Sequence, residues 1–141
     1  MAVRILGFTV DAVHTNTKTD WVFLHVLTDC TPSIRGLGEI RSGGAATGNF
    51  CAAALACLAA VEAQVVGRDP RNVEQIVGAL LAVQAPPAYG EGERATKVWR
   101  VAASALESAL FDIAGKLAGL PIYQVRKTPN WSRTWVNCSL V

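Results

Sequence analysis

The ligands that proteins use for transition metals are scarce in this sequence. Its 141 residues include two histidines and four cysteines. None of the cysteines belongs to a CxxC pair or stands at the Cys/His spacing of a zinc site. A zinc protein is therefore not indicated, and the cysteines fit free thiols in a reducing compartment best.

Charge, export signals and membrane-spanning runs are scarce as well. Charged residues make up 17% of the chain and the net charge is +2, which is too little for a nucleic-acid footprint. The start, MAVRILGFTV, lacks the n-region, continuous apolar core and cleavage site of a signal peptide. The apolar residues 50–67 are mainly alanine and include Glu62 and Gln64, which favours a buried helix over a membrane span. We expect a cytoplasmic protein that binds neither nucleic acid nor a membrane.

Three strand-like runs lie in the first third of the chain. They cover residues 3–13, 20–29 and 34–42. In the second run Val22, Leu24 and Val26 recur with a period of two. The connections HTNTKT and CTPS are short and carry turn residues. We therefore predict a three-stranded antiparallel meander.

Three segments with helical periodicity follow the strands. Apolar positions repeat every three to four residues in residues 50–66, 70–83 and 98–118. Asp69 as N-cap, followed by Pro70 as first helical residue, predicts the start of the second helix. Gly67 and Gly119 predict the ends of the first and third helices. Strands followed by a helical layer indicate an α+β domain.

A single further strand is predicted after the helices, at residues 134–141 (TWVNCSLV). The meander is already complete at that point, so this strand has no partner among the other predicted elements. We interpret it as an orphan strand that begins a second structural unit.

Three segments, in this order along the chain, resemble one known family. They are VLTDCTPSIRGLGEI (residues 26–40), VVGRDPRNVEQI (65–76) and ASALESALFDIAGKLAGLPIY (103–123). They are similar to segments of the N-terminal capping domain of the enolase superfamily, in its mandelate racemase and muconate lactonizing enzyme branch. The resemblance implies a capping domain at residues 1–121. It also implies that residues 122–141 form the junction to a (β/α)₈ barrel and its first strand, the rest of the barrel being absent.

The resemblance further implies a chemistry that this chain would not complete alone. Enzymes of the family remove a proton α to a carboxylate with the help of Mg²⁺, and their metal ligands and bases lie on later barrel strands. A full-length form would act on a carboxylate-bearing substrate such as a sugar acid, as a dehydratase or racemase. In this chain the eleven acidic residues are dispersed, and His14 and His25 suit turn or sheet positions. We therefore expect no catalytic residue and no metal ligand in it.

In the family, two loops of the capping domain fold over the substrate, and the resemblance places both in this chain. The matching residues are His14, Thr15, Asn16, Thr17 and Lys18 in the first loop and Arg41, Ser42, Gly43, Gly44, Thr47 and Asn49 in the second. Glycines would loosen the second loop, and Arg41 can pair with a carboxylate. We predict these residues to form a substrate lid.

Two other interpretations remain open at this point. The glycines of GLGEIRSGGAATG precede a helix, where phosphate can bind. However, no lysine follows in a GK[ST] arrangement, and Gly36 and Gly38 lie within a strand-like run. The chain could instead be a self-standing binding or protein-interaction module that uses the faces of its sheet and of its alanine-rich helix. Formation of a homo-oligomer is compatible with a lid or with such a module.

Overall fold

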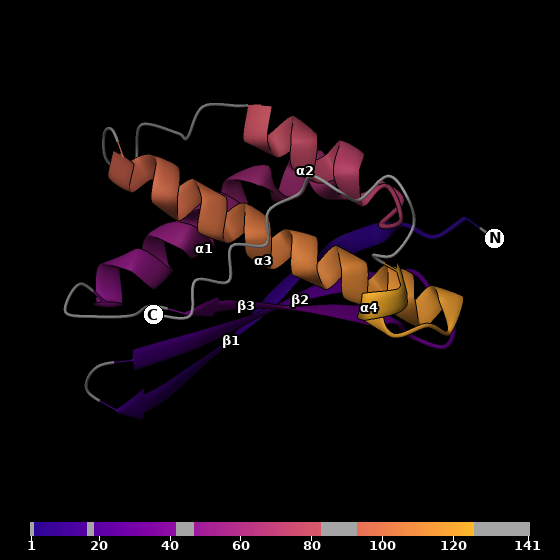
Figure 1. Cartoon of the computed structure of the whole chain (residues 1–141), viewed down its shortest axis with the longest axis horizontal. Helices are drawn as coiled ribbons and strands as arrows, with labels where there is room; N and C mark the ends of the chain where they lie inside the picture. The colour runs from indigo at the N-terminus through magenta and orange to yellow at the C-terminus, as the bar shows by residue number, and fades with distance from the viewer. Residues whose placement is uncertain (1, 17–18, 42–46, 83–92, 126–141) are drawn as a thin grey trace.

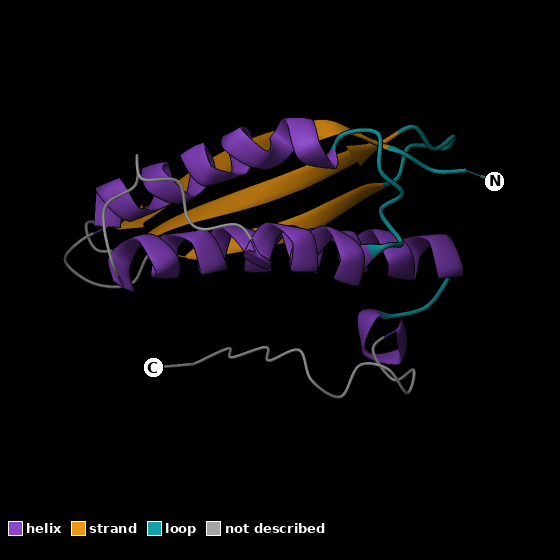
Figure 2. Cartoon of the chain, turned by 90° about the horizontal axis from the view of Figure 1, so that it is seen from above, coloured by secondary structure: helices purple, strands orange, loops and turns teal. Residues whose placement is uncertain are grey.

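One antiparallel sheet, covered on one face by helices, makes up the described part of the chain (Figure 1). The computed structural model describes residues 2–16, 19–41, 47–82 and 93–125. The elements are, in chain order, β1 (Ile5–Asn16), β2 (Thr19–Thr28), β3 (Arg35–Arg41), α1 (Thr47–Val65), α2 (Val73–Ala82), α3 (Glu93–Ala118) and α4 (Ile122–Val125). Seen from above, in Figure 2, the short α4 lies beside the C-terminal end of α3.

The sheet has the order β1-β2-β3 with antiparallel pairing throughout, so the predicted meander is confirmed. Val22, Leu24 and Val26 of the central strand are buried against the helices, as their period of two predicts. The first connection is shorter than predicted, because Asn16 of β1 pairs directly with Thr19 of β2. Most of the stretch HTNTKT therefore belongs to strands, since backbone pairing along the hairpin continues almost to its end.

Strand β3 and helix α3 approach each other backbone to backbone at two glycines. A Cβ atom built on Gly38 would lie 2.0 Å from the carbonyl oxygen of Ala105, and one built on Gly36 would lie 2.0 Å from that of Ala109. No side chain larger than a hydrogen atom fits at either position. The glycines of GLGE thus allow the longest helix to lie directly on the sheet.

The start of α2 differs from the prediction. The helix begins at Val73, whereas Asp69 and Pro70 were expected to cap and open it. The amide of Asn72 donates to the carbonyl of Asp69 (3.1 Å), and the amide of Ile76 donates to the carbonyl of Asn72 (3.0 Å). Residues 69–72 therefore form a separate turn, and the helical hydrogen bonds start one turn later than the proline suggested.

Two glycines end helices as predicted. Gly67 has φ +83° and Gly119 has φ +65°, a left-handed conformation that glycine adopts without steric cost. After α1, the amide of Gly67 donates to the carbonyl of Ile5 (2.8 Å), and the amide of Ile5 donates to the carbonyl of Arg68 (3.0 Å). The end of the first helix is thereby tied to the first strand.

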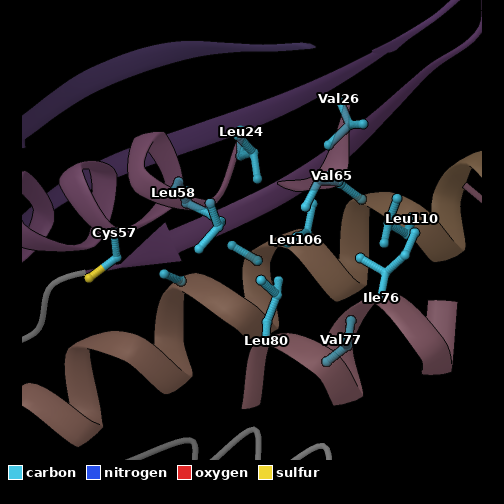
Figure 3. Packing of buried hydrophobic residues seen from close by; sticks show 14 of the residues in the cluster. Leu24, Val26, Cys57, Leu58, Val65, Ile76, Val77, Leu80, Leu106 and Leu110 are labelled. Carbon is cyan, nitrogen blue, oxygen red and sulfur yellow. The ribbon is translucent and has the colours of Figure 1, made fainter. Parts of the chain in front are cut away.

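The hydrophobic core lies between the sheet and the helices (Figure 3). All three strands and the helices α1, α2 and α3 contribute side chains to it. The residues labelled there are Leu24, Val26, Cys57, Leu58, Val65, Ile76, Val77, Leu80, Leu106 and Leu110. Trp99 of α3 is buried, and its indole N–H donates to the carbonyl of Leu80 at 3.0 Å. This bond satisfies the polar atom of a large core side chain and joins α3 to the end of α2.

The fold class is α+β, as predicted, with strands preceding helices. The long closing helix starts at Glu93, earlier than the predicted residue 98. The orphan strand predicted at residues 134–141 lies outside the described residues. Among the described helices, none has the length and apolar character needed to cross a membrane.

Candidate functional site

The backbones of the two predicted lid segments meet at one end of the sheet. His14 of β1 pairs with Asp20, and Arg41 at the end of β3 pairs with Trp21, the next residue of β2. The hairpin between β1 and β2 and the end of β3 are therefore neighbours across the first residues of the central strand. Figure 1 shows the N-terminal end of α1 at this same end of the molecule.

The predicted lid residues are distributed over strands, a helix and undescribed stretches. His14, Thr15 and Asn16 belong to β1, and Arg41 is the last residue of β3. Thr47 and Asn49 lie in the first turn of α1, so both are helical where a loop was predicted. The remaining predicted residues, Thr17, Lys18, Ser42, Gly43 and Gly44, lie outside the described residues.

Strand β3 is held by two charged side chains of α3. The Asp112 carboxylate oxygen Oδ2 accepts from the amide of Leu37 (2.9 Å) and from Lys116 Nζ (2.6 Å). The same Nζ donates to the carbonyl of Arg35 at 2.8 Å. Asp112 and Lys116 are four residues apart, a spacing that suits an ion pair along a helix, but this spacing gives no sign of their contact with the strand. The two side chains form hydrogen bonds with backbone groups on the outer edge of β3. Another strand could otherwise pair with β3 at this edge.

A carboxylate from α1 occupies the opposite edge of the sheet in the same way. The amide of Phe8 donates to Glu62 Oε1 at 2.9 Å. A glycine precedes this point, and a Cβ on Gly7 would lie 3.0 Å from the same oxygen. Sequence periodicity had placed Glu62 within an apolar helix without a role, and the structure shows that it anchors β1.

His25 forms a side-chain hydrogen bond with Asp11 on the face of the sheet that the helices do not cover. Its Nε2 lies 2.9 Å from Asp11 Oδ2, and the side chains are 14% and 72% exposed. The alternation along β2 puts His25 on the face opposite Leu24 and Val26. Its location in the sheet agrees with the structural role predicted for it.

The turn before α2 contains a short-range carboxylate–guanidinium pair. Asp69 Oδ1 accepts from the amide and from Nε of Arg71, both at 2.9 Å. The hydrogen bond from the Arg71 side chain holds the pKa of the Asp69 carboxyl below its usual range. Within the core, burial raises the pKa of the Cys57 thiol, so this cysteine is kept as a neutral, unreactive thiol.

Within residues 2–16, 19–41, 47–82 and 93–125, no group of three His, Cys, Asp or Glu side chains could hold a metal ion. The carboxylates of Asp112 and Glu62 each accept a hydrogen bond from a backbone amide. The described residues therefore do not fit a magnesium site.

A groove of about 270 Å³ opens between β3, α3 and α4. Its lining consists of Leu37, Ser108, Phe111, Asp112 and Ile122. Leu37 pairs with His25 in the middle of β2, so the groove lies away from the end of the sheet where the lid segments meet. Sequence periodicity gave no sign of it, because the groove depends on how α4 folds back beside α3.

Comparison with known proteins agrees with the geometry. The model of the mandelate racemase / muconate lactonizing enzyme N-terminal domain matches residues 4–125. No curated protein sequence matches the chain. Solved structures do match, and three of them show the range of similarity.

The first is a protein from Zymomonas mobilis ZM4 to which dehydratase activity is ascribed; it is 30% identical, with a TM-score of 0.66, over 88% of this chain and 30% of its own. The second is an enolase from Pseudomonas fluorescens Pf0-1 with bound magnesium, potassium and tartrate, 22% identical with a TM-score of 0.63, over 91% of this chain and 32% of its own. The third is the L-talarate/galactarate dehydratase of Salmonella typhimurium LT2 with Mg and L-lyxarohydroxamate, 19% identical with a TM-score of 0.59, over 92% of this chain and 34% of its own. The chain thus spans about a third of the length of these proteins, and the last two comparisons concern the fold alone.

Proposed function

The chain belongs to the mandelate racemase / muconate lactonizing enzyme family, whose N-terminal domain it matches over residues 4–125, and we propose that it is the capping domain of an enzyme of this family. In this proposal residues 1–121 form the cap, and residues 122–141 form the junction and the first strand of a (β/α)₈ barrel. The share of each solved relative that the chain covers, 30–34%, supports a division into a short cap and a longer catalytic part.

The lid role rests on one observation above all. The β1–β2 hairpin and the end of β3 lie side by side at one end of the sheet. Two segments that neighbour each other can cover one substrate together. His14 to Lys18 and Arg41 to Asn49 are accordingly proposed as the substrate-lid segments, with Arg41 as the partner of a substrate carboxylate.

The proposed substrate of the complete enzyme is a sugar acid or a related hydroxy acid. Relatives have been solved with magnesium and tartrate, and with magnesium and a lyxarohydroxamate, which supports this class of ligand. The magnesium ion would supply positive charge where negative charge develops next to the carboxylate. In this proposal the metal ligands and the base belong to the catalytic part, as the family resemblance implies, and this chain alone is inactive.

A fused enzyme tests the lid role directly. Residues 1–125 of this chain would be continued by the part of the Zymomonas mobilis relative that follows its matched third. Replacing Arg41 by alanine should lower kcat/KM for sugar acids by roughly 10- to 100-fold, because a hydrogen bond to a charged group contributes about 1.5–3 kcal/mol. Arg35→Ala is the matched control, since it changes the same residue type on the same strand at the end away from the lid.

The result for the control decides the interpretation. The proposal holds if Arg41→Ala raises KM while Arg35→Ala leaves it within about twofold. Equal effects of the two variants, or none from either, would contradict a lid role for the end of β3. The cytoplasmic location and any homo-oligomer stay predictions.

A further inference from the structure

One residue of the central strand is paired beside both proposed lid segments. Trp21 of β2 pairs with Val13 of β1, the residue directly before the first segment. It also pairs with Arg41 of β3, the residue that opens the second segment. Within the described pairing, the register with β3 starts at Trp21, so Trp21 is the outermost residue of β2 that has a strand partner on both sides.

These three residues lie on one face of the sheet. Val22, the residue after Trp21, is 2% exposed and faces the helices, so Trp21 lies on the opposite face. Residues that pair directly in antiparallel strands share a face, with their Cβ atoms about 4.5–5.5 Å apart. Val13 and Arg41 therefore flank Trp21 on the face that the helices do not cover. An aromatic ring at this position has the size to reach toward both neighbours.

Phe23 provides a comparison on the same face. Both Trp21 and Phe23 are only partly exposed, although both lie on the face opposite the helices. Their strand partners differ, because Phe23 pairs with Asp11 and Glu39. Neither of these partners belongs to a proposed lid segment. The two aromatic residues thus share strand, face and degree of burial, and only Trp21 adjoins the lid.

The position of Trp21 bears on how two lid segments act together. A lid binds its substrate in the arrangement that brings both segments over it. When the segments move independently, this arrangement is populated for a smaller fraction of the time, and the apparent affinity falls by that fraction. A rigid ring packed between the ends of both segments links their movements and raises the competent fraction.

We infer that Trp21 is a positioning residue that couples the two lid segments and so holds them together over the substrate. The inference rests on the proposed function, because it takes residues 14–18 and 41–49 to be the lid.

Kinetics of the fused enzyme defined above test the positioning role. Trp21→Val keeps a residue that suits a strand but removes the ring, and it should raise KM for sugar acids by about 3- to 10-fold with kcat within about twofold. Trp21→Phe restores a ring and should bring KM back to within about twofold of the unchanged enzyme. Phe23→Val is the matched control and should leave KM within about twofold, since it removes a ring from the same face away from the lid.

Amide hydrogen exchange of the 141-residue chain tests the coupling without catalysis. Trp21→Val should speed exchange by about threefold or more in the peptides that cover residues 14–20 and 41–49, and Phe23→Val should leave the second peptide within about twofold. Unchanged exchange in either peptide, or a KM that both valine variants raise equally, would overturn the inference.

The remaining outcomes separate the inference from the proposed function. If Arg41→Ala raises KM and Trp21→Val does not, the lid stands and the positioning role of Trp21 is rejected. If neither variant raises KM while Trp21→Val speeds exchange in both peptides, the proposed lid is rejected and the coupling of the two segments by Trp21 is retained.

Discussion

Replacing Gly38 by alanine should strongly destabilise the domain, because α3 leaves no space for a side chain there. The added Cβ would lie 2.0 Å from the carbonyl oxygen of Ala105, 2.8 Å from its carbonyl carbon and 3.3 Å from its Cα. Favourable contacts need roughly 3.5 Å, so β3 and α3 would have to separate by about 1.5 Å. Because all three obstacles are backbone atoms, no rotation of a side chain relieves the clash.

The size of the effect follows from what that separation would disturb. Leu106 and Leu110 of α3 are fully buried in the core, and a shift of their helix loosens contacts around both. Overpacked core positions cost about 1–3 kcal/mol, occasionally more, and the rigid obstacle here favours about 3 kcal/mol or more. Such a loss is a large part of the total stability of roughly 5–15 kcal/mol that is typical of domains.

Urea unfolding followed by circular dichroism gives the free energy of unfolding for comparison. Gly78→Ala is the matched control, because Gly78 is exposed in α2 and a Cβ there would meet nothing within 4 Å. That variant should gain about 0.5–1 kcal/mol from higher helix propensity. If Gly38→Ala stayed within about 0.5 kcal/mol of the unchanged chain, the close contact between β3 and α3 would be refuted.

Three further predictions concern charged and buried groups. Asp112→Ala should cost about 1–2 kcal/mol of unfolding free energy through the lost bonds to β3, while Glu74→Ala, exposed on α2, should stay within about 0.5 kcal/mol; equal effects would count against the clamp. Since the pKa of Asp69 is lowered in the folded state, Asp69→Asn should lower the free energy of unfolding at neutral pH. The difference in unfolding free energy between the variant and the unchanged chain should fade as the pH drops below about 4. A difference that grows on acidification would refute this prediction. Cys57, buried and with its pKa raised, should be alkylated at least about tenfold more slowly than the more accessible Cys30 in the native state, and similar rates would show that the core opens readily.

Much of the fold was predictable because its signals are local. The period of two in β2 and the left-handed glycines Gly67 and Gly119 depend on a few neighbouring residues, and each was confirmed. The start of α2 was predicted wrongly for the opposite reason. Proline at position 70 suits a first helical turn, but the bonds of Asp69 to Arg71 and Asn72 stabilise a separate turn instead.

The contacts that connect distant segments were not predictable from spacing. The four-residue spacing of Asp112 and Lys116 suits a helical ion pair, yet their bonds to the backbone of β3 depend on how α3 lies on the sheet. The same holds for Glu62 and the amide of Phe8. The lid prediction depended on family resemblance, and the structure adds that the two segments are neighbours, through pairing that only the sheet register reveals.

In the proposed function, this chain supplies a lid and leaves catalysis to the downstream domain. The most direct test measures exchange of the proton α to the carboxylate into deuterated water, with Mg²⁺ and a panel of sugar acids. The 141-residue chain alone should show no exchange above background and no saturable magnesium binding by calorimetry, whereas the fused enzyme should exchange at least one member of the panel. Exchange by the chain alone, together with one-site magnesium binding, would contradict the claim.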